Sequence, residues 1–369
     1  TTTPFSLSGW RLEGVGYTFP DHAVLTPNSY LVLVRDRQAF ALAYGALVAA
    51  FDEFPGSLDN GGETLRLVKP GTTPDLDRVV SDVRYDDDPP WPAAAAGTGP
   101  SLQLVDSAQD PYRVGNWMST AAGDPYRATP GRANAGRATL DPFPPVWINE
   151  VLARNVSGPE DNRGEREPFI EMYNAGSTAV DLTDFRLSDA ATDLTRWSFP
   201  PGTVLGAGQF LRVWADGESL ESAAGSLHTA FRIAPDTGLV LLSRLQGNPA
   251  RLVVLDFLNY AQLPAGRSAG CYPDGEPRQR RTFSRVTPGV ANDPTFPSVS
   301  VAINEFMASN QRTLVNPYNG RRDDWFELFN AGTSPVDLTG YFLSDSLTNT
   351  TGFEIPPGFV VPPGGFLLV

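Results

Sequence analysis

Residues 167–189 read EPFIEMYNAGSTAVDLTDFRLSD, and residues 323–345 read DDWFELFNAGTSPVDLTGYFLSD. The two stretches are identical at Glu171 and Glu327, and at three short motifs that follow with equal spacing: Asn-Ala-Gly, Val-Asp-Leu-Thr and Leu-Ser-Asp. A sequence that returns together with its flanking residues marks a repeated structural unit. We therefore interpret the rest of the chain as copies of one domain.

Each copy is predicted to form a strand, a turn and a returning strand. Residues 169–173 are a short run of aromatic and aliphatic side chains, and the Asn-Ala-Gly that follows contains two residue types that tolerate positive φ. Residues 180–187 supply the returning strand. In the later copy, alternation along residues 325–329 leaves both faces of the strand largely apolar, so we expect that strand to lie inside a sheet.

The composition favours an all-β protein. The 369 residues include 35 glycines and 34 prolines, and helix-forming residues are not clustered. Turn signals recur about every ten residues, which is typical of β-sandwiches and barrels. The length is sufficient for about two or three domains of ordinary size.

Charge and apolar content argue against several classes of partner. The net charge is −14 and Lys69 is the only lysine, whereas a nucleic-acid-binding surface needs clustered basic side chains to displace counterions. No apolar run is long enough to insert into a membrane as a spanning helix. Cys271 is the only cysteine, so we expect neither an intramolecular disulfide nor a thiolate metal cluster.

Alignment of the motifs gives three copies. Residues 1–139 form a first copy that lacks its opening strands, residues 146–293 form a complete copy, and residues 299–369 form the N-terminal part of a third. Because the two outer copies are predicted to have unpaired strand edges, we expect this stretch of chain to self-associate. The predicted core residues of the complete copy are Phe185, Leu187, Trp197, Phe199 and Phe210.

The order of the motifs resembles that of the lamin-tail domain. Ile-Asn-Glu at 148–150 and 303–305 precedes the aromatic strand, and Pro-Pro-Gly and a Phe-Leu strand follow the repeated stretch. Thr-Pro-Gly closes the copies at 129–131 and 287–289. The resemblance spans nearly the whole chain and implies an all-β fold of tandem immunoglobulin-like β-sandwiches of the lamin-tail type, the first and last incomplete.

The resemblance also carries expectations about location. Lamin-tail domains end the nuclear lamins, and bacterial relatives occur in tandem in large exported or cell-surface proteins, often beside hydrolase or spore-coat-type kinase domains. The present tandem layout, which lacks coiled-coil heptads, is similar to the bacterial kind. The resemblance therefore implies an extracellular or cell-surface protein, and it disfavours a role at the nuclear envelope.

Four glutamates recur with the repeat and could be interpreted as catalytic. Glu150 and Glu305 lie in the opening strand, and Glu171 and Glu327 lie in the next one. A pair of carboxylates could act as general acid and base, as in glycoside hydrolysis. We favour a structural role, because a catalytic pair is needed once whereas a structural part is needed in every copy.

Two acidic segments are candidates for calcium, which takes oxygen ligands. They are residues 86–88, all aspartate, and the loop that contains Glu160, Asp161, Asn162 and Glu165. Neither has the spacing of a dedicated calcium loop, and Arg163 and Arg166 oppose a cation in the second. We expect solvated loops and no metal ion.

The remaining motifs favour no active site. His22 and His228 are the only histidines and belong to different copies, so neither a zinc site nor a histidine-based triad is expected. Ser8-Gly9 lacks the context of a nucleophile elbow. Trp91 could offer a platform to a sugar, but its counterpart Leu263 in the complete copy favours an apolar plug.

We therefore predict no catalytic, cofactor-binding or metal-binding residues. The chain is interpreted as a non-enzymatic structural or interaction segment of a larger, exported or cell-surface protein, with a protein or cell-surface component as its partner. The alternative is an accessory region that binds substrate for, or positions, the catalytic domain of an extracellular hydrolase or kinase-like enzyme.

Overall fold

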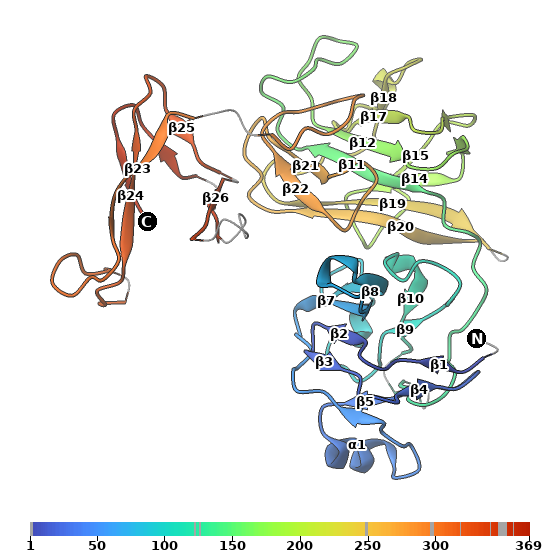
Figure 1. The fold of residues 1–369 in the computed structure, drawn as a ribbon. Coiled ribbons are helices and arrows are strands. Elements are labelled where there is room, and N and C mark those ends of the chain that lie inside the picture. The colour runs from blue at the N-terminus through green and yellow to red at the C-terminus, as the bar shows by residue number, and fades with distance from the viewer. Residues whose placement is uncertain are drawn as a thin grey trace. The chain divides into compact units, whose positions relative to one another are not determined.

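The computed structural model describes residues 3–121, 123–124, 127–247, 250–295, 299–317, 319–339, 341–345, 353–356 and 358–369. In this part of the chain almost all regular structure is β, in sheets of two to six strands (Figure 1). No helix among the described residues is long and apolar enough to cross a membrane. The predicted all-β class is confirmed.

The chain divides into two compact units, each built from separate segments. The first contains Thr1–Pro144, Thr183–Phe199 and Leu241–Phe257, and the second contains Pro145–Leu182, Pro200–Val240 and Leu258–Val369. Residues of the complete copy therefore belong to both units.

The N-terminal part of the first unit is a set of short strands with one α-helix among its described residues. The strands are β1 (Phe5–Ser6), β2 (Arg11–Glu13), β3 (Tyr17–Thr18), β4 (Val24–Leu25), β5 (Leu33–Val34), β6 (Asp52–Glu53), β7 (Gly62–Lys69), β8 (Arg78–Asp86), β9 (Gln103–Leu104) and β10 (Trp117–Met118). Short 3₁₀ turns are η1 (Pro74–Leu76), η2 (Ala93–Ala95) and η3 (Val114–Asn116). Sheet β3-β2-β7-β8 is the largest here, and a cluster around Trp10, Tyr17 and Phe19 forms its core.

Helix α1 (Arg37–Tyr44) is absent from the sequence prediction. Asp36 caps its first turn by accepting a hydrogen bond from the Ala39 N–H at 2.8 Å, and Gly45 ends it at a φ of 86°. No residue of this helix is buried. Because it lacks a buried apolar stripe, hydrophobic periodicity could not reveal it.

The second sheet of the first unit comes from the complete copy. It runs β15-β14-β19-β20, with β14 (Phe185–Ser188), β15 (Trp197–Ser198), β19 (Gly238–Gln246) and β20 (Arg251–Tyr260). Four of the five predicted core residues, Phe185, Leu187, Trp197 and Phe199, are at most 8% exposed, which confirms their predicted burial. The prediction was wrong for Phe210, in the second unit, which is only half-buried and packs its ring 4.7 Å from that of Tyr173.

The second unit is built around a six-stranded sheet in the order β18-β17-β12-β11-β21-β22. Its strands are β11 (Val146–Leu152), β12 (Phe169–Asn174), β17 (Phe210–Trp214), β18 (Leu227–His228), β21 (Ser268–Cys271) and β22 (Arg280–Phe283). Beside it lie η4 (Ser219–Glu221) and the ribbon of β13 (Val180–Asp181) and β16 (Val204–Leu205). Every residue of β11 is buried, as suits a central strand.

The third copy, also in the second unit, repeats the centre of this sheet. Its strands are β23 (Val301–Met307), β24 (Trp325–Asn330), β25 (Val336–Asp337), β26 (Phe342–Leu343), β27 (Phe353–Glu354), β28 (Val360–Val361) and β29 (Phe366–Leu368). Strand β24 lies between β23 and β29, so the prediction that it is internal is confirmed. Ile303 and Phe306 on β23 are 65% and 71% exposed.

The repeated Asn-Ala-Gly turn is closed by a side chain and not by positive φ. The Asn174 side chain donates to the carbonyl oxygens of Thr178 and Leu205, at 2.8 and 3.1 Å, and accepts from the Gly176 N–H at 2.9 Å. Asn330 makes the equivalent three bonds in the third copy. Glycine is required because a Cβ at Gly176 would stand 2.5 Å from Pro145. The predicted turn is therefore present, but its proposed mechanism was wrong.

Candidate functional site

The recurrent glutamates form a buried pair in the complete copy. Glu150 on β11 lies opposite Glu171 on β12, and both are 0% exposed. A β-bulge between Ile148 and Glu150 sets this register and leaves Asn149 as the extra residue. The same bulge occurs between Ile303 and Glu305 in the third copy.

The closing Thr-Pro-Gly segment is fastened to this pair. The Thr287 N–H lies 3.2 Å from both carboxylate oxygens of Glu150, and the Ser268 hydroxyl donates to Oε1 of Glu150 at 2.6 Å. The Gly289 N–H donates to Oε2 of Glu171 at 2.5 Å. The two carboxyl groups therefore hold the end of the copy against the central strands.

An asparagine completes the closing segment. Asn292 donates to the carbonyl oxygens of Asn149 and Cys271, at 3.0 and 2.8 Å, and its Oδ1 accepts from the Thr287 hydroxyl at 3.0 Å. In the first copy, the Thr129 hydroxyl donates to Asn134, which donates to the Leu104 carbonyl at 2.9 Å. The Thr-Pro-Gly…Asn pattern is thus a structural lock that recurs in both copies.

Burial controls the protonation of the pair. The pKa of Glu171 is raised to about 8, chiefly by burial and also by the nearby Glu150, against the opposing effects of the Gly289 N–H and Arg212. Burial also raises the pKa of Glu150, although its Ser268 and Thr287 donors oppose the shift. Oε1 of Glu171 is buried and has no hydrogen-bond partner among the described residues. At neutral pH, the geometry and charge favour a protonated Glu171.

The third copy contains the same pair without this enclosure. Glu305 lies opposite Glu327 in the same register, but Glu305 is exposed and Glu327 is only partly buried. Asn304 donates to Oε1 of Glu327 at 2.7 Å. The burial of the pair in the complete copy therefore depends on the strands and closing segment that follow.

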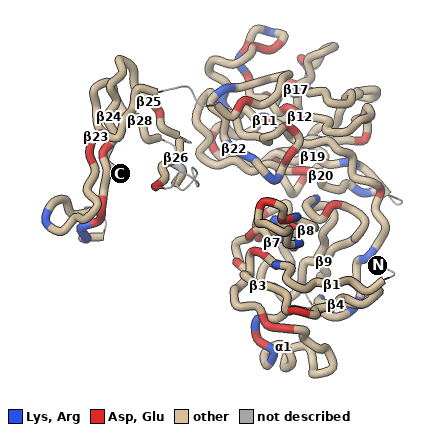
Figure 2. The backbone as a smooth tube through the Cα atoms, viewed as in Figure 1, with Lys and Arg blue, Asp and Glu red and all other residues tan. Residues whose placement is uncertain are grey.

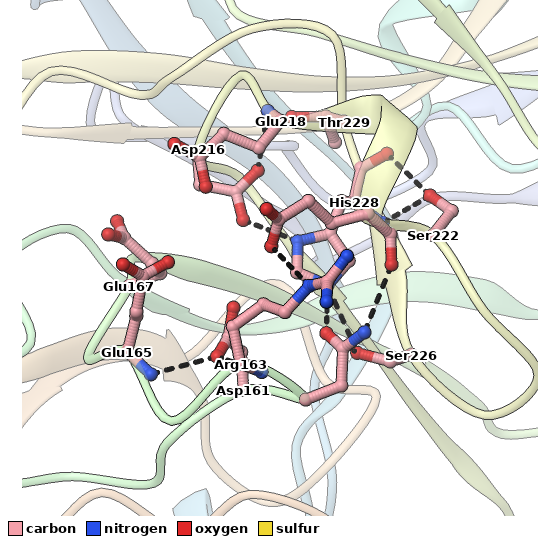
Figure 3. Close-up of polar contacts among 12 residues, drawn as sticks. Asp161, Arg163, Glu165, Glu167, Asp216, Glu218, Ser222, Ser226, His228 and Thr229 are labelled. Carbon is pink, nitrogen blue, oxygen red and sulfur yellow. Dashed lines mark hydrogen bonds and ion pairs between the residues drawn. The ribbon is translucent and has the colours of Figure 1, made fainter.

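A second polar cluster of the complete copy surrounds His228 (Figure 3). His228 lies on β18, is 0% exposed, and places its Nδ1 2.6 Å from Oδ2 of Asp216. Its Nε2 lies 2.7 Å from Oδ1 of Asn162 and 3.1 Å from the Ser226 hydroxyl. The Ser222 hydroxyl accepts from the His228 backbone N–H at 3.0 Å, which fixes the strand that carries the ring.

The loop before β12 contributes a further carboxylate. Oδ1 of Asp161 accepts from the backbone N–H groups of Arg163 and Glu165, at 2.8 and 2.9 Å. Burial works to raise the pKa of Asp161, but these donors and the nearby His228 ring outweigh it, so the pKa is lowered. Ligand atoms of Asp161, Asp216 and His228 lie within 4.8 Å of one another, which is close enough to share a metal ion.

The structure brings some of the sequence-predicted polar residues together and separates others. Asp161, Asn162 and Glu165 lie in or beside the His228 cluster, whereas Glu160 pairs instead with Arg166 at 2.6 Å. The three aspartates at 86–88 form a separate group in the first unit. The structure places Asp161 and Asp216, from distant loops, beside His228, and the expectation of no zinc site stays a prediction.

The remaining candidates have ordinary structural environments. Trp91 and Leu263 are each 4% exposed, as the plug interpretation expects and a sugar platform does not. The Ser8 hydroxyl accepts from the backbone N–H of the exposed His22 at 2.9 Å. Figure 2 shows the basic residues scattered along the described chain instead of gathered in one patch.

The comparisons with known proteins identify the family. The family model of the lamin tail domain matches residues 141–252 and 294–369, which together are just over half of the chain. The chain belongs to the lamin tail domain family, and its fold class is that of immunoglobulin-like β-sandwiches. No curated protein matches the chain. The first copy lies outside the matched residues, and the predicted boundaries of all three copies, 1–139, 146–293 and 299–369, stay predictions.

Proposed function

We propose that this chain is a non-enzymatic structural or interaction segment of a larger, exported or cell-surface protein. Membership of the lamin tail domain family supports a structural or interaction role. The exported location rests on the resemblance of the tandem layout to the bacterial members. The partner we propose is a protein or another component of the cell surface.

The main support for the proposal is that the paired carboxylates of Glu150 and Glu171 are buried and hydrogen-bonded to the closing segment. Hydrolysis by such a pair needs access for a substrate and a water molecule. Glu150 and Glu171 are 0% exposed, and their oxygens accept hydrogen bonds from Ser268, Thr287 and Gly289. The pair is thus occupied in holding the closing segment, which is a structural task.

The linker between the first two copies supports the same role. Within the first unit, the Gly247 N–H donates to Asp141 at 3.0 Å, and Arg244 donates to the Pro142 carbonyl at 3.2 Å. Arg113 is 2% exposed and donates to the carbonyl oxygens of Pro144 and Leu255, at 2.8 and 2.9 Å. A linker held by hydrogen bonds in this way suits a structural segment.

Replacing the buried arginine should loosen this linker. In Arg113→Ala the Pro144 and Leu255 carbonyls lose their donors, at a cost of about 1.5–3 kcal/mol for each bond to the charged guanidinium. We expect limited proteolysis to cut within residues 140–146 faster than in the unmodified chain. Arg78→Ala, at an exposed position in the same unit, is the control and should leave the rate unchanged. An unaltered rate in Arg113→Ala would remove this support for a structural role.

The non-enzymatic part of the proposal is tested by turnover. We expect the purified chain to hydrolyse phosphoester, peptide and glycosidic substrates no faster than buffer. Glu171→Gln keeps the shape of the side chain and removes its ability to ionise and to transfer a proton, so it separates activity of the pair from contamination. Hydrolysis by the unmodified chain that disappears in Glu171→Gln would overturn the proposal.

A further inference from the structure

Both ring nitrogens of His228 face an oxygen atom, whereas a neutral imidazole carries only one ring proton. The Asn162 amide nitrogen donates to the Glu221 carbonyl at 3.0 Å, so Oδ1 of Asn162 is the atom that faces the ring. Nε2 of His228 therefore carries a hydrogen that it donates to Asn162. In the neutral ring this leaves the Nδ1 lone pair directed at Oδ2 of Asp216, 2.6 Å away.

A neutral ring therefore leaves the contact between Nδ1 and Asp216 without a proton. A second ring proton would supply this hydrogen bond to Asp216, but it would give Oδ2 of Asp161 no hydrogen-bond donor. Oδ2 of Asp161 is buried and has no hydrogen-bond partner among the described residues, although its ligand atom lies within 4.8 Å of those of Asp216 and His228. A buried carboxylate oxygen without a donor is costly unless an ion satisfies it. A divalent cation satisfies all three groups at once.

We propose that Asp161, Asp216 and His228 bind one divalent transition-metal ion of the zinc class. The donor set contains an imidazole nitrogen and two carboxylates, which zinc accepts, whereas calcium prefers oxygen alone. The surroundings also orient the ligands: Asn162 fixes the ring tautomer, and the Glu218 N–H donates to Oδ1 of Asp216 at 3.0 Å. Glu165 and Glu221, grouped with Asp161, add negative charge, which the ion pair of Arg163 with Glu221 at 3.4 Å partly offsets.

The metal would join three separate parts of the complete copy. Asp161 belongs to the loop before β12, Asp216 follows β17, and His228 is on β18 (Figure 3). Without the ion, this loop is tied to the cluster by the bonds of Asn162 to His228, Ser226 and Glu221 and by the ion pair of Arg163 with Glu221. We therefore expect metal binding to slow amide hydrogen exchange across residues 157–166.

The first test titrates ZnCl2 into the full chain by calorimetry, with CaCl2 and MgCl2 as parallel arms. We expect one saturable zinc site, and an affinity reduced at least about tenfold in Asp161→Asn and in His228→Gln. The controls are Asp87→Asn, in the exposed aspartate group, and His22→Gln, the other histidine, and both should bind as the unmodified chain does. Absence of saturable zinc binding overturns the proposal, as does affinity that Asp161→Asn leaves unchanged.

A second measurement protects the test against misfolding of the buried His228 variant. The chain contains two histidines, so ¹⁵N-histidine NMR shows two rings. Zinc should shift the ring nitrogens of His228 and leave those of His22 unchanged, and hydrogen exchange should slow within 157–166. Shifts confined to His22, or calcium binding tighter than zinc binding, would overturn the assignment.

Discussion

Replacing Phe199 by alanine is expected to cost the complete copy about 3–5 kcal/mol of unfolding free energy, which is the usual range for deletion of a fully buried phenylalanine ring. Phe199 is 2% exposed, and its ring lies edge-on to that of Trp197 at 4.7 Å. Both residues were predicted from the sequence to be buried. The loss should appear in urea unfolding, followed by hydrogen exchange of peptides from β14 and β19.

Phe306→Ala is the matched control for this prediction. It removes the same ring from β23, where Phe306 is 71% exposed, so little apolar surface is returned to water. The β14 and β19 peptides should unfold at the same urea concentration as in the unmodified chain. A Phe199→Ala midpoint that also stays unchanged would show that this ring does not belong to the core.

The repeat made much of the fold predictable. The stretch 323–345 carries the same strand residues and the same Asn-Ala-Gly as 167–189, and the structure gives both an internal strand and the same side-chain turn. Short runs of aromatic and aliphatic residues identified the strands, and apolar residues on both faces indicated an internal position, because successive side chains point to opposite faces of a sheet. The predicted burial of Phe210 was wrong because Phe210 begins β17, where the sheet covers only part of the ring.

The polar clusters were less predictable, because side-chain partners come from distant parts of the chain. The four glutamates were found through their recurrence, but the enclosure of Glu150 and Glu171 by Thr287 and Gly289 could be seen only in the folded copy. The His228 cluster joins residues 161, 216 and 228 from separate loops and strands. No local spacing links these three positions, so a motif search has nothing to detect.

The stability of the complete copy should fall as the pH rises, because of Glu171. Its pKa is about 8 in the folded copy, against 4.5 for an ordinary glutamate. Below pH 4.5 the carboxyl is protonated in both states, and its favourable contribution is fully present. Between 4.5 and about 8 the unfolded chain releases the proton while the folded copy retains it, so the unfolding free energy decreases. The loss is on the order of 3–5 kcal/mol, at about 1.4 kcal/mol per pKa unit.

Glu171→Gln tests this assignment, because glutamine imitates the protonated carboxyl and cannot ionise. We expect the variant to unfold at the same urea concentration as the unmodified chain in acid, and at a higher concentration above pH 8. Glu150, whose pKa burial also raises, should leave a residual slope in the same direction. Glu327→Gln alters the partly buried counterpart in the third copy and should leave the pH dependence of the β11 and β12 peptides unchanged. If the unfolding free energy of Glu171→Gln falls with pH as steeply as that of the unmodified chain, Glu171 is not the group that retains the proton. The closing segment would then not be held by a neutral Glu171.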